Sequence, residues 1–265
     1  IRIDSVQTAG SLTLNGLQVS AGQLVTRADI DAGFLVFTPS ENTNGTAYTS
    51  FSFTVEDNRQ LMSETSNVIT FDVAAVNDAP VLADTPLTLT VAEDGGAPVG
   101  AVGSLVSSLI SGITDVDTGA LKGFAITASN ETNGIWYYST DGGSNWNTVG
   151  PVSNAASLLL ADDANTRIYF APASNYNGMS LSALTLRAWD RTTGLAGAKV
   201  DSNSNGGTTE FSSATDTVDV TVTAVADTPI NVVPGAQSVN EDTLLAISGI
   251  SVTDPDNNLS TVQVS

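Results

Sequence analysis

The chain has 265 residues, of which 28 are acidic and 8 are basic, so its formal net charge is −20. Nucleic acid and anionic membranes are poor partners for such a chain, because phosphate binding needs Lys and Arg to displace counterions. Cys and His are both absent, which excludes disulfides, thiolate zinc sites and the Ser-His-Asp and Cys-His forms of nucleophilic catalysis. The acidic surplus fits either plain solubility or the binding of divalent cations through carboxylate oxygens.

Strands account for most of the regular structure that the sequence predicts. Apolar and polar residues alternate along 51–55, 69–73 and 218–222, which places the apolar side chains on one face of each strand. Gly, Asn, Asp and Ser interrupt these runs at short intervals, as in an antiparallel β-sandwich. Helical periodicity is scarce, and we expect one short turn within 104–111.

Two proline-containing linkers divide the chain. Asn77-Asp78-Ala79-Pro80 and Ala226-Asp227-Thr228-Pro229 each follow a valine-rich run, and proline forces an extended residue before it. We therefore predict a partial domain over 1–78 that holds C-terminal strands, a complete domain over 79–228, and a partial domain over 229–265 that holds N-terminal strands. The two partial domains contain complementary pieces, as when a tandem array is cut at the same point in two repeats.

The complete domain carries two insertions, at 134–161 and 191–215. The polar, Gly-rich stretch 201–209 is expected to be a surface loop. Ser139 to Trp146 resembles the Asp-box hairpin turn of sialidase propellers, which predicts a β-hairpin with Trp146 packed beneath it. The neighbouring aromatic residues have two interpretations, burial in the core or an exposed sugar-binding face; they are Trp136, Tyr137, Tyr138 and Trp146.

Acidic motifs recur at matching places along the chain. Each linker leads to an acidic pair, Glu93-Asp94 or Glu241-Asp242, and then to a D-x-D motif. A lone D-x-D is usually a turn, because Asp caps turns through its own backbone. In a sandwich, however, the incoming linker and the loops before the third and last strands lie at one end, where carboxylates from several motifs meet. Carboxylate, amide and carbonyl oxygens are the ligands that Ca²⁺ prefers. The predicted ligands are Asn77, Asp78, Asp115, Asp117 and Asp190 at the first junction, and Glu93, Asp227, Asp254 and Asp256 at the second.

Four segments carry a family resemblance: 37–45 with its counterpart 170–178, the run 55–80, and the stretch 91–119. They resemble the cadherin-like tandem repeats of giant bacterial surface and RTX-type adhesins. The resemblance implies an all-β tandem of cadherin-like, Ig-like Greek-key β-sandwiches with Ca²⁺ at the joints between neighbouring repeats. It is incomplete where cadherins carry further acidic residues, because this chain has Asn175, Asn177 and Ala75 there, so one or two ions per joint are expected.

These observations predict a calcium-stiffened extender module of a secreted bacterial cell-surface adhesin, acting in adhesion or biofilm formation. We expect no enzyme and no membrane insertion. One alternative is a module whose insertions bind a glycan or a surface protein. Another is head-to-tail self-association through the two partial domains, whose apolar residues would otherwise be exposed; these are Ile1, Ile3, Val6, Leu244, Ile247 and Ile250.

Overall fold

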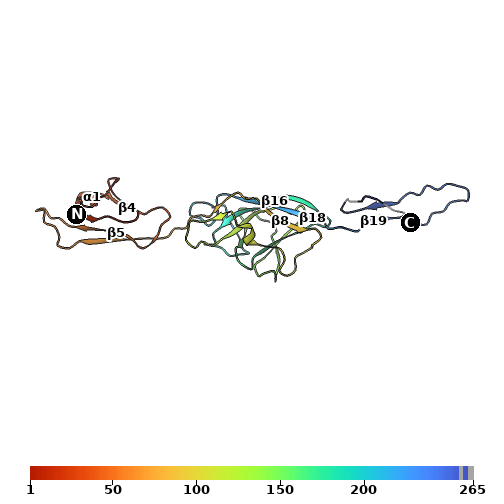
Figure 1. The fold of residues 1–265 in the computed structure, drawn as a ribbon, viewed down its shortest axis with the longest axis horizontal. Helices are drawn as coiled ribbons and strands as arrows, with labels where there is room; N and C mark the ends of the chain where they lie inside the picture. The colour runs from red at the N-terminus through yellow and green to blue at the C-terminus, as the bar shows by residue number, and fades with distance from the viewer. Residues whose placement is uncertain (257–258, 262–265) are drawn as a thin grey trace. The chain divides into compact units, whose positions relative to one another are not determined.

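The computed structural model describes residues 1–256 and 259–261 and divides into two compact units, Ile1–Asn77 and Asp78–Ser265. The regular structure of both units consists almost entirely of strands (Figure 1), which confirms the predicted all-β class. The helical elements are α1 (Arg27–Asp31) and the short 3₁₀ turn η1 (Val106–Leu109), which lies in the stretch where a turn was predicted. Among the described residues, no helix has the length and hydrophobicity needed to cross a bilayer.

The first unit contains two three-stranded sheets around its own core. Their strand orders are β1-β5-β6 and β3-β2-β4. The strands are β1 (Arg2–Ser5), β2 (Ser11–Leu14), β3 (Leu17–Gln18), β4 (Leu35–Thr38), β5 (Gly45–Thr54) and β6 (Asn67–Val73). Core side chains come from both sheets and from the segment before α1; they are Ile3, Leu12, Val19, Val25 and Phe51.

One sequence expectation fails in this core. Ile3 was predicted to be exposed at an incomplete end, but it is fully buried. The reason is that β1 pairs with β5, with Ile3 opposite Phe53, so the unit closes its core over Ile3 without further strands. Ile1 is half-buried, while Val6, Leu244, Ile247 and Ile250 are exposed as expected.

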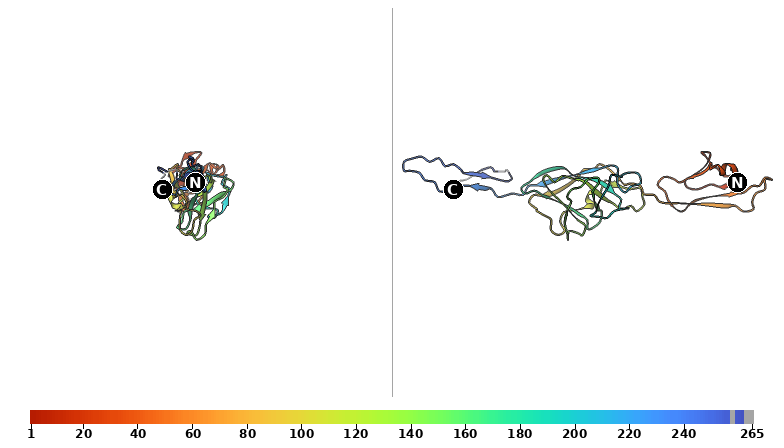
Figure 2. Two further views of the ribbon diagram at one scale, coloured as in Figure 1. Left: turned by 90° about the vertical axis from the view of Figure 1, so that its right-hand side faces the viewer. Right: turned by 180° about the vertical axis from the view of Figure 1, so that it is seen from behind.

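The second unit is a sandwich of a six-stranded and a four-stranded sheet (Figure 1 and, from other sides, Figure 2), with strand orders β17-β14-β11-β16-β18-β8 and β13-β12-β15-β9. Two further strand pairs belong to this unit, β7-β10 and, in the segment after the sandwich, β19-β20. The strands are β7 (Val81–Leu82), β8 (Leu87–Ala92), β9 (Ser104–Leu105), β10 (Ile113–Thr114), β11 (Gly123–Ser129), β12 (Gly134–Ser139), β13 (Asn147–Thr148), β14 (Ser157–Ala161), β15 (Arg167–Pro172), β16 (Gly178–Trp189), β17 (Lys199–Val200), β18 (Asp216–Thr223), β19 (Ile230–Val232) and β20 (Ser251–Thr253).

Alternation along the strands fills the core of this sandwich. Val218, Val220 and Val222 of β18 are buried, whereas the residues between them are not, as a period of two requires. From the facing sheet, Trp136 and Phe170 are completely buried with their ring centroids 4.9 Å apart. Burying a side chain of this kind stabilises the fold by about 1.5–3 kcal/mol.

The predicted hairpin is present. Strands β12 and β13 pair through Tyr137 opposite Thr148, and the turn between them is held by side-chain hydrogen bonds. Gly143 N donates to Ser139 Oγ at 2.9 Å, and Asn145 N donates to Asp141 Oδ1 at 2.9 Å. Trp146 packs edge-on against Tyr169 with ring centroids 6.1 Å apart, and it remains partly exposed.

The loop over 201–209 lacks strands, as predicted, but one of its residues anchors it to the sandwich. Ser202 is fully buried, and its Oγ lies 2.6 Å from Ser157 Oγ on β14. Ser202 N also donates to Asn154 O at 2.6 Å. The loop is therefore fixed to the sandwich near its own start, at Ser202.

Candidate metal centres

The first candidate site lies where the linker enters the second unit. Strands β7 and β10 pair antiparallel with Thr114 opposite Val81, so the residues before β7 and those after β10 lie at the same end. Asp78 N donates to Asp117 Oδ2 at 2.8 Å, and Asp117 N donates to Asp115 Oδ1 at 2.8 Å. The pairing thus joins three predicted ligands in one hydrogen-bonded chain.

Asp190 adds a fourth carboxylate to this group. It follows β16 and is buried, and its Oδ1 accepts hydrogen bonds from Thr192 N at 2.8 Å and Thr192 Oγ1 at 2.6 Å. Burial raises the pKa of Asp115, the amide hydrogen bond from Asp117 lowers it, and the charges of Asp117, Asp190 and Asp78 raise it further. Asp115 Oδ2 is buried and has no hydrogen-bond partner. The cluster therefore combines mutual repulsion with an unsatisfied oxygen.

The second candidate site repeats this hydrogen-bond pattern after β18. Strands β19 and β20 pair with Ile230 opposite Thr253, which again brings a linker beside a D-x-D motif. Asp227 N donates to Asp256 Oδ2 at 2.7 Å, and Asp256 N donates to Asp254 Oδ1 at 3.0 Å. Two buried oxygens, Asp227 Oδ2 and Asp256 Oδ1, lack a hydrogen-bond partner.

Carboxylates at the end of β8 face this second group. Glu93 is 2% exposed, and its Oε1 accepts from Val225 N at 2.7 Å while its Oε2 accepts from Asn177 Nδ2 at 3.3 Å. Burial raises the pKa of Asp227, and the negative charges that raise it further are, in decreasing order, those of Asp94, Asp256, Glu93 and Asp254. Glu93 was predicted for this site from the sequence.

Asp94 is the residue that the predicted ligand set omitted. Its backbone has a positive φ of 62°, and its Oδ1 accepts from Asn175 N at 3.0 Å. Its position next to Glu93 in an acidic pair was the available signal. Two nearby asparagines donate to this pair, Asn175 through its main-chain amide to Asp94 and Asn177 through its side chain to Glu93.

The structure brings most of the predicted residues into two clusters, and calcium ligation by them stays a prediction. Asn77 is the last residue of the first unit, and the structure does not test its role. In the part of the chain that the structure describes, no three carboxylates are arranged, as they stand, to hold a metal ion.

The donor chemistry of both clusters nevertheless fits calcium. Every side-chain ligand offered is an oxygen, and each cluster contains a buried carboxylate oxygen with no hydrogen-bond partner. The basic side chains of the second unit are directed elsewhere, since all of them donate to main-chain carbonyls. The pairs are Lys122 with Ile113, Arg167 with Val102 and Gly103, Arg187 with Ser212 and Ser213, Arg191 with Asp162, and Lys199 with Val149 and Pro151.

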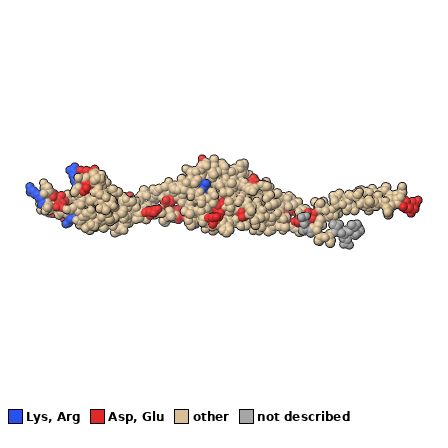
Figure 3. All heavy atoms as spheres, turned by 90° about the horizontal axis from the view of Figure 1, so that it is seen from above, with Lys and Arg blue, Asp and Glu red and all other residues tan. Residues whose placement is uncertain are grey.

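Few Lys and Arg side chains are available to neutralise the carboxylates. Red carboxylate patches recur in Figure 3, whereas blue basic groups are few. The ion pairs that the structure describes both lie in the first unit, Arg2 with Asp4 at 3.6 Å and Arg27 with Asp31 at 3.2 Å. Divalent cations from solution are therefore suitable counter-charges for the two clusters.

Comparison with solved structures finds distant structural similarity to a cadherin-type protein, a likeness of fold alone. No family model matches the chain, and no curated protein matches it. A solved structure described as the protocadherin gammaB7 EC3-6 cis-dimer is 18% identical with a TM-score of 0.39. The match covers 83% of this chain and 46% of that one, so the chain spans less than half of the structure it matches. Similarity at this level carries no argument about function, which rests on the geometry above.

Proposed function

We propose that the chain is a calcium-dependent structural module in which Ca²⁺ binds at the two linkers. The observation that carries the proposal is the repeated chain of hydrogen bonds, from Asp78 to Asp117 to Asp115 at one linker and from Asp227 to Asp256 to Asp254 at the other. A repeated arrangement of carboxylates with buried, unsatisfied oxygens is costly unless a cation compensates it.

The residues would contribute as follows. At the first linker, Asp78, Asp115, Asp117 and Asp190 would supply carboxylate oxygens, joined by Asn77 from the preceding residue. At the second linker, the contributors would be Glu93, Asp94, Asp227, Asp254 and Asp256. A bound Ca²⁺ would supply positive charge that offsets the repulsion among these groups. Because the contributors come from a linker and from loops of a sandwich, binding would restrict the movement of the linker.

The biological role that we propose is that of an extender module in a secreted bacterial cell-surface adhesin, serving adhesion or biofilm formation without catalysis. Support comes from the four motif-bearing segments that resemble bacterial adhesin repeats and from the tandem linkers. Neighbouring repeats would then be the main partners, since stability in tandem arrays comes from each unit and its nearest neighbours.

Calcium titration with two readouts tests the proposal. Calcium should raise the midpoint of thermal unfolding, and small-angle X-ray scattering should show a longer and stiffer particle than in EDTA. Magnesium at equal concentration is the control, because it demands near-ideal octahedral geometry and gives up its water reluctantly. Unchanged unfolding midpoints in EDTA would refute calcium binding, and identical scattering profiles would refute the stiffening role.

A further inference from the structure

The insertion that precedes β18 has a spacing of polar residues that neither linker cluster has. The sequence Asp-Ser-Asn-Ser-Asn-Gly runs from Asp201 to Gly206, so an oxygen-bearing amide or carboxylate stands at every second position before the glycine. Calcium loops of the helix-loop-helix kind place side-chain ligands at their first, third and fifth positions, a glycine at the sixth and a main-chain carbonyl at the seventh. Counted from the aspartate, those positions are Asp201, Asn203, Asn205, Gly206 and Gly207.

The structure gives this stretch the backbone that the pattern requires. Gly206 has a φ of 74°, in the left-handed region that glycine adopts without strain, so the chain can turn sharply there. Both ends are anchored to the sandwich, because Ser202 is fully buried with its Oγ 2.6 Å from Ser157 Oγ, and Phe211 is buried as well. Gly206 N donates to Phe211 O at 2.7 Å, which closes the turn. The protein itself therefore holds the loop in place.

Oxygen atoms of the loop converge on its two asparagine amides. Asn203 Nδ2 donates to Asp201 Oδ1 at 2.7 Å. Asn205 Nδ2 donates to two main-chain carbonyls, Ser202 O at 3.3 Å and Asn203 O at 2.8 Å. Each amide nitrogen thus lies among acceptor oxygens, as a cation would. Because an asparagine amide carries an oxygen opposite its NH₂ group, half a rotation of the amide would present that oxygen instead.

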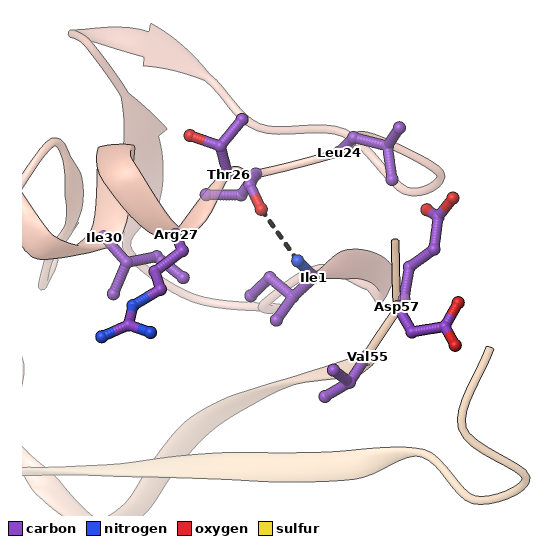
Figure 4. A pocket seen from close by; sticks show the side chains of 9 residues that line it. Ile1, Leu24, Thr26, Arg27, Ile30, Val55 and Asp57 are labelled. Atoms are coloured by element: carbon purple, nitrogen blue, oxygen red, sulfur yellow. Dashed lines mark hydrogen bonds between the residues drawn. The ribbon is translucent and has the colours of Figure 1, made fainter. Parts of the chain in front are cut away.

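Other aspartates of the chain form turns without this set of oxygens. Asp57 lines the groove shown in Figure 4, and its Oδ1 accepts from Arg59 N at 2.8 Å. The Oδ1 of Asp163 likewise accepts from the main-chain N–H groups two and three residues further on. Asp201 Oδ1 accepts from Asn203 N at 2.8 Å in the same manner. A basic residue, however, stands at the third position counted from Asp57 and at the fifth counted from Asp163, so capping explains those turns completely.

The loop also contacts the first linker through its main chain. Gly207 O, at the seventh position, accepts from Ala79 N at 2.8 Å, and Ala79 directly follows Asp78. A carbonyl oxygen has two lone pairs, so Gly207 O can keep this hydrogen bond and bind a cation as well. Three residues later, Glu210 O accepts from Asp190 N at 3.1 Å. An ion held by the loop would therefore also fix the insertion against the entry of the linker.

We propose that residues 201–207 form a third calcium site, separate from the two linker clusters. The ligands are the carboxylate of Asp201, the amide oxygens of Asn203 and Asn205, and the carbonyl of Gly207. Water completes the coordination, since calcium takes about six to eight oxygens. The twelfth position is Ser212 and not the bidentate glutamate of tight loops, and the ligand set carries one negative charge. The site is therefore weak, with a Kd on the order of 10⁻⁴–10⁻³ M, as in extracellular calcium modules.

Amide NMR spectra of the full, isotope-labelled chain during a calcium titration test the proposal, with ionic strength held constant by sodium chloride. The amides of Asn203, Asn205 and Gly206 should shift along one saturable curve, with a midpoint on the order of 10⁻⁴–10⁻³ M. Asp201→Asn should raise that midpoint by roughly tenfold or more, because the loop loses its carboxylate. Asp163→Asn is the matched control, since it removes the charge of another aspartate turn in the same sandwich. It should leave the curve unchanged.

The same spectra separate this site from the linker clusters. Asp201 is exposed, so Asp201→Asn should keep the fold, and the unchanged dispersion of the other amide signals verifies this. Shifts at Asp117 and Asp256 report the linker clusters, so calcium that moves residues 203–206 but neither of these refutes the proposed function and supports the third site. Calcium that moves the linker residues and leaves 203–206 unmoved overturns the third site. A non-saturating response, or equal loss of the response in Asp201→Asn and Asp163→Asn, would overturn it as well.

Discussion

The two linkers share one hydrogen-bond pattern, but the carboxylates around them are carried by different elements of the fold. At the first, Asp115, Asp117 and Asp190 all lie in loops of the complete sandwich. At the second, Glu93 and Asp94 come from the sandwich, whereas Asp254 and Asp256 follow β20, which among the strands that the structure describes pairs with β19 alone. A linker and a D-x-D motif are therefore enough to form the chain of hydrogen bonds. What a bound Ca²⁺ would stabilise therefore depends on where the remaining proposed ligands are anchored.

The largest loss of calcium-induced stabilisation is expected when carboxylates of the first cluster are removed. At free calcium a hundredfold above Kd, binding at the proposed site would stabilise the folded chain by about 2.7 kcal/mol. For a unit of this size that corresponds to roughly 5–10 °C in the unfolding midpoint. Asp115→Ala with Asp117→Ala should remove more than half of this shift in differential scanning calorimetry. A double variant that keeps the whole calcium shift would contradict the assignment of these ligands.

Breaking the second cluster should have a smaller thermal effect. Asp254→Ala with Asp256→Ala leaves the sandwich core intact and should lower the calcium-induced shift less than the first double variant does. Isothermal titration calorimetry should still register the loss, as a reduced number of bound ions. Equal thermal losses from the two double variants would show that the supports of the clusters do not differ.

Removing one negative charge from the first cluster should change the unfolding midpoint in opposite directions with and without calcium. In EDTA, Asp115→Asn removes a negative charge and so relieves the repulsion from Asp117, Asp190 and Asp78. It should therefore raise the unfolding midpoint in EDTA and lower it in calcium. A variant that shifts the midpoint in the same direction in both buffers would argue against a metal site.

The stability gained by Asp115→Asn in EDTA should depend on pH. The pKa of Asp115 is raised in the folded state, so the stability it contributes is complete below the unfolded value, about 3.9, and is lost as pH rises through the folded pKa. In EDTA the advantage of Asp115→Asn over the unmodified chain should therefore shrink as the buffer is acidified from neutral pH toward pH 4. If the difference in unfolding midpoint between the variant and the unmodified chain stays constant over this range, the raised pKa of Asp115 does not affect stability.

The smallest effect is expected at a carboxylate outside both clusters. Hydrogen bonds led by the Asn145 side chain lower the pKa of Asp141 to about 2. The stability from this group is present above the unfolded pKa and is lost as pH falls toward about 2. Asp141→Asn should destabilise the hairpin slightly and by the same amount in calcium and in EDTA. A calcium-dependent difference would mean that the hairpin and the linkers are coupled.

The sequence predicted the structure best where a repeated pattern of residues corresponds directly to a structural feature. Alternation predicted the buried valines of β18, and the matching D-x-D motifs predicted which carboxylates would meet near each linker. It failed at Ile3, because the alternation does not reveal whether a short strand finds a partner within its own unit. It also omitted Asp94, whose place in the second cluster depends on a positive-φ turn and on a loop amide far away in the chain.

The parallel pairing of β8 and β18 has a mechanical consequence. These strands are the first long strand and the last strand of the sandwich, and they pair from Val218 opposite Leu87 to Thr223 opposite Ala92. A pull on the two ends of this segment would draw the strands past each other along their length. The hydrogen bonds between them would then bear the load together and break together, whereas an antiparallel hairpin pulled from its open end loses them one at a time. The sandwich is thus built to resist tension applied through its own chain ends.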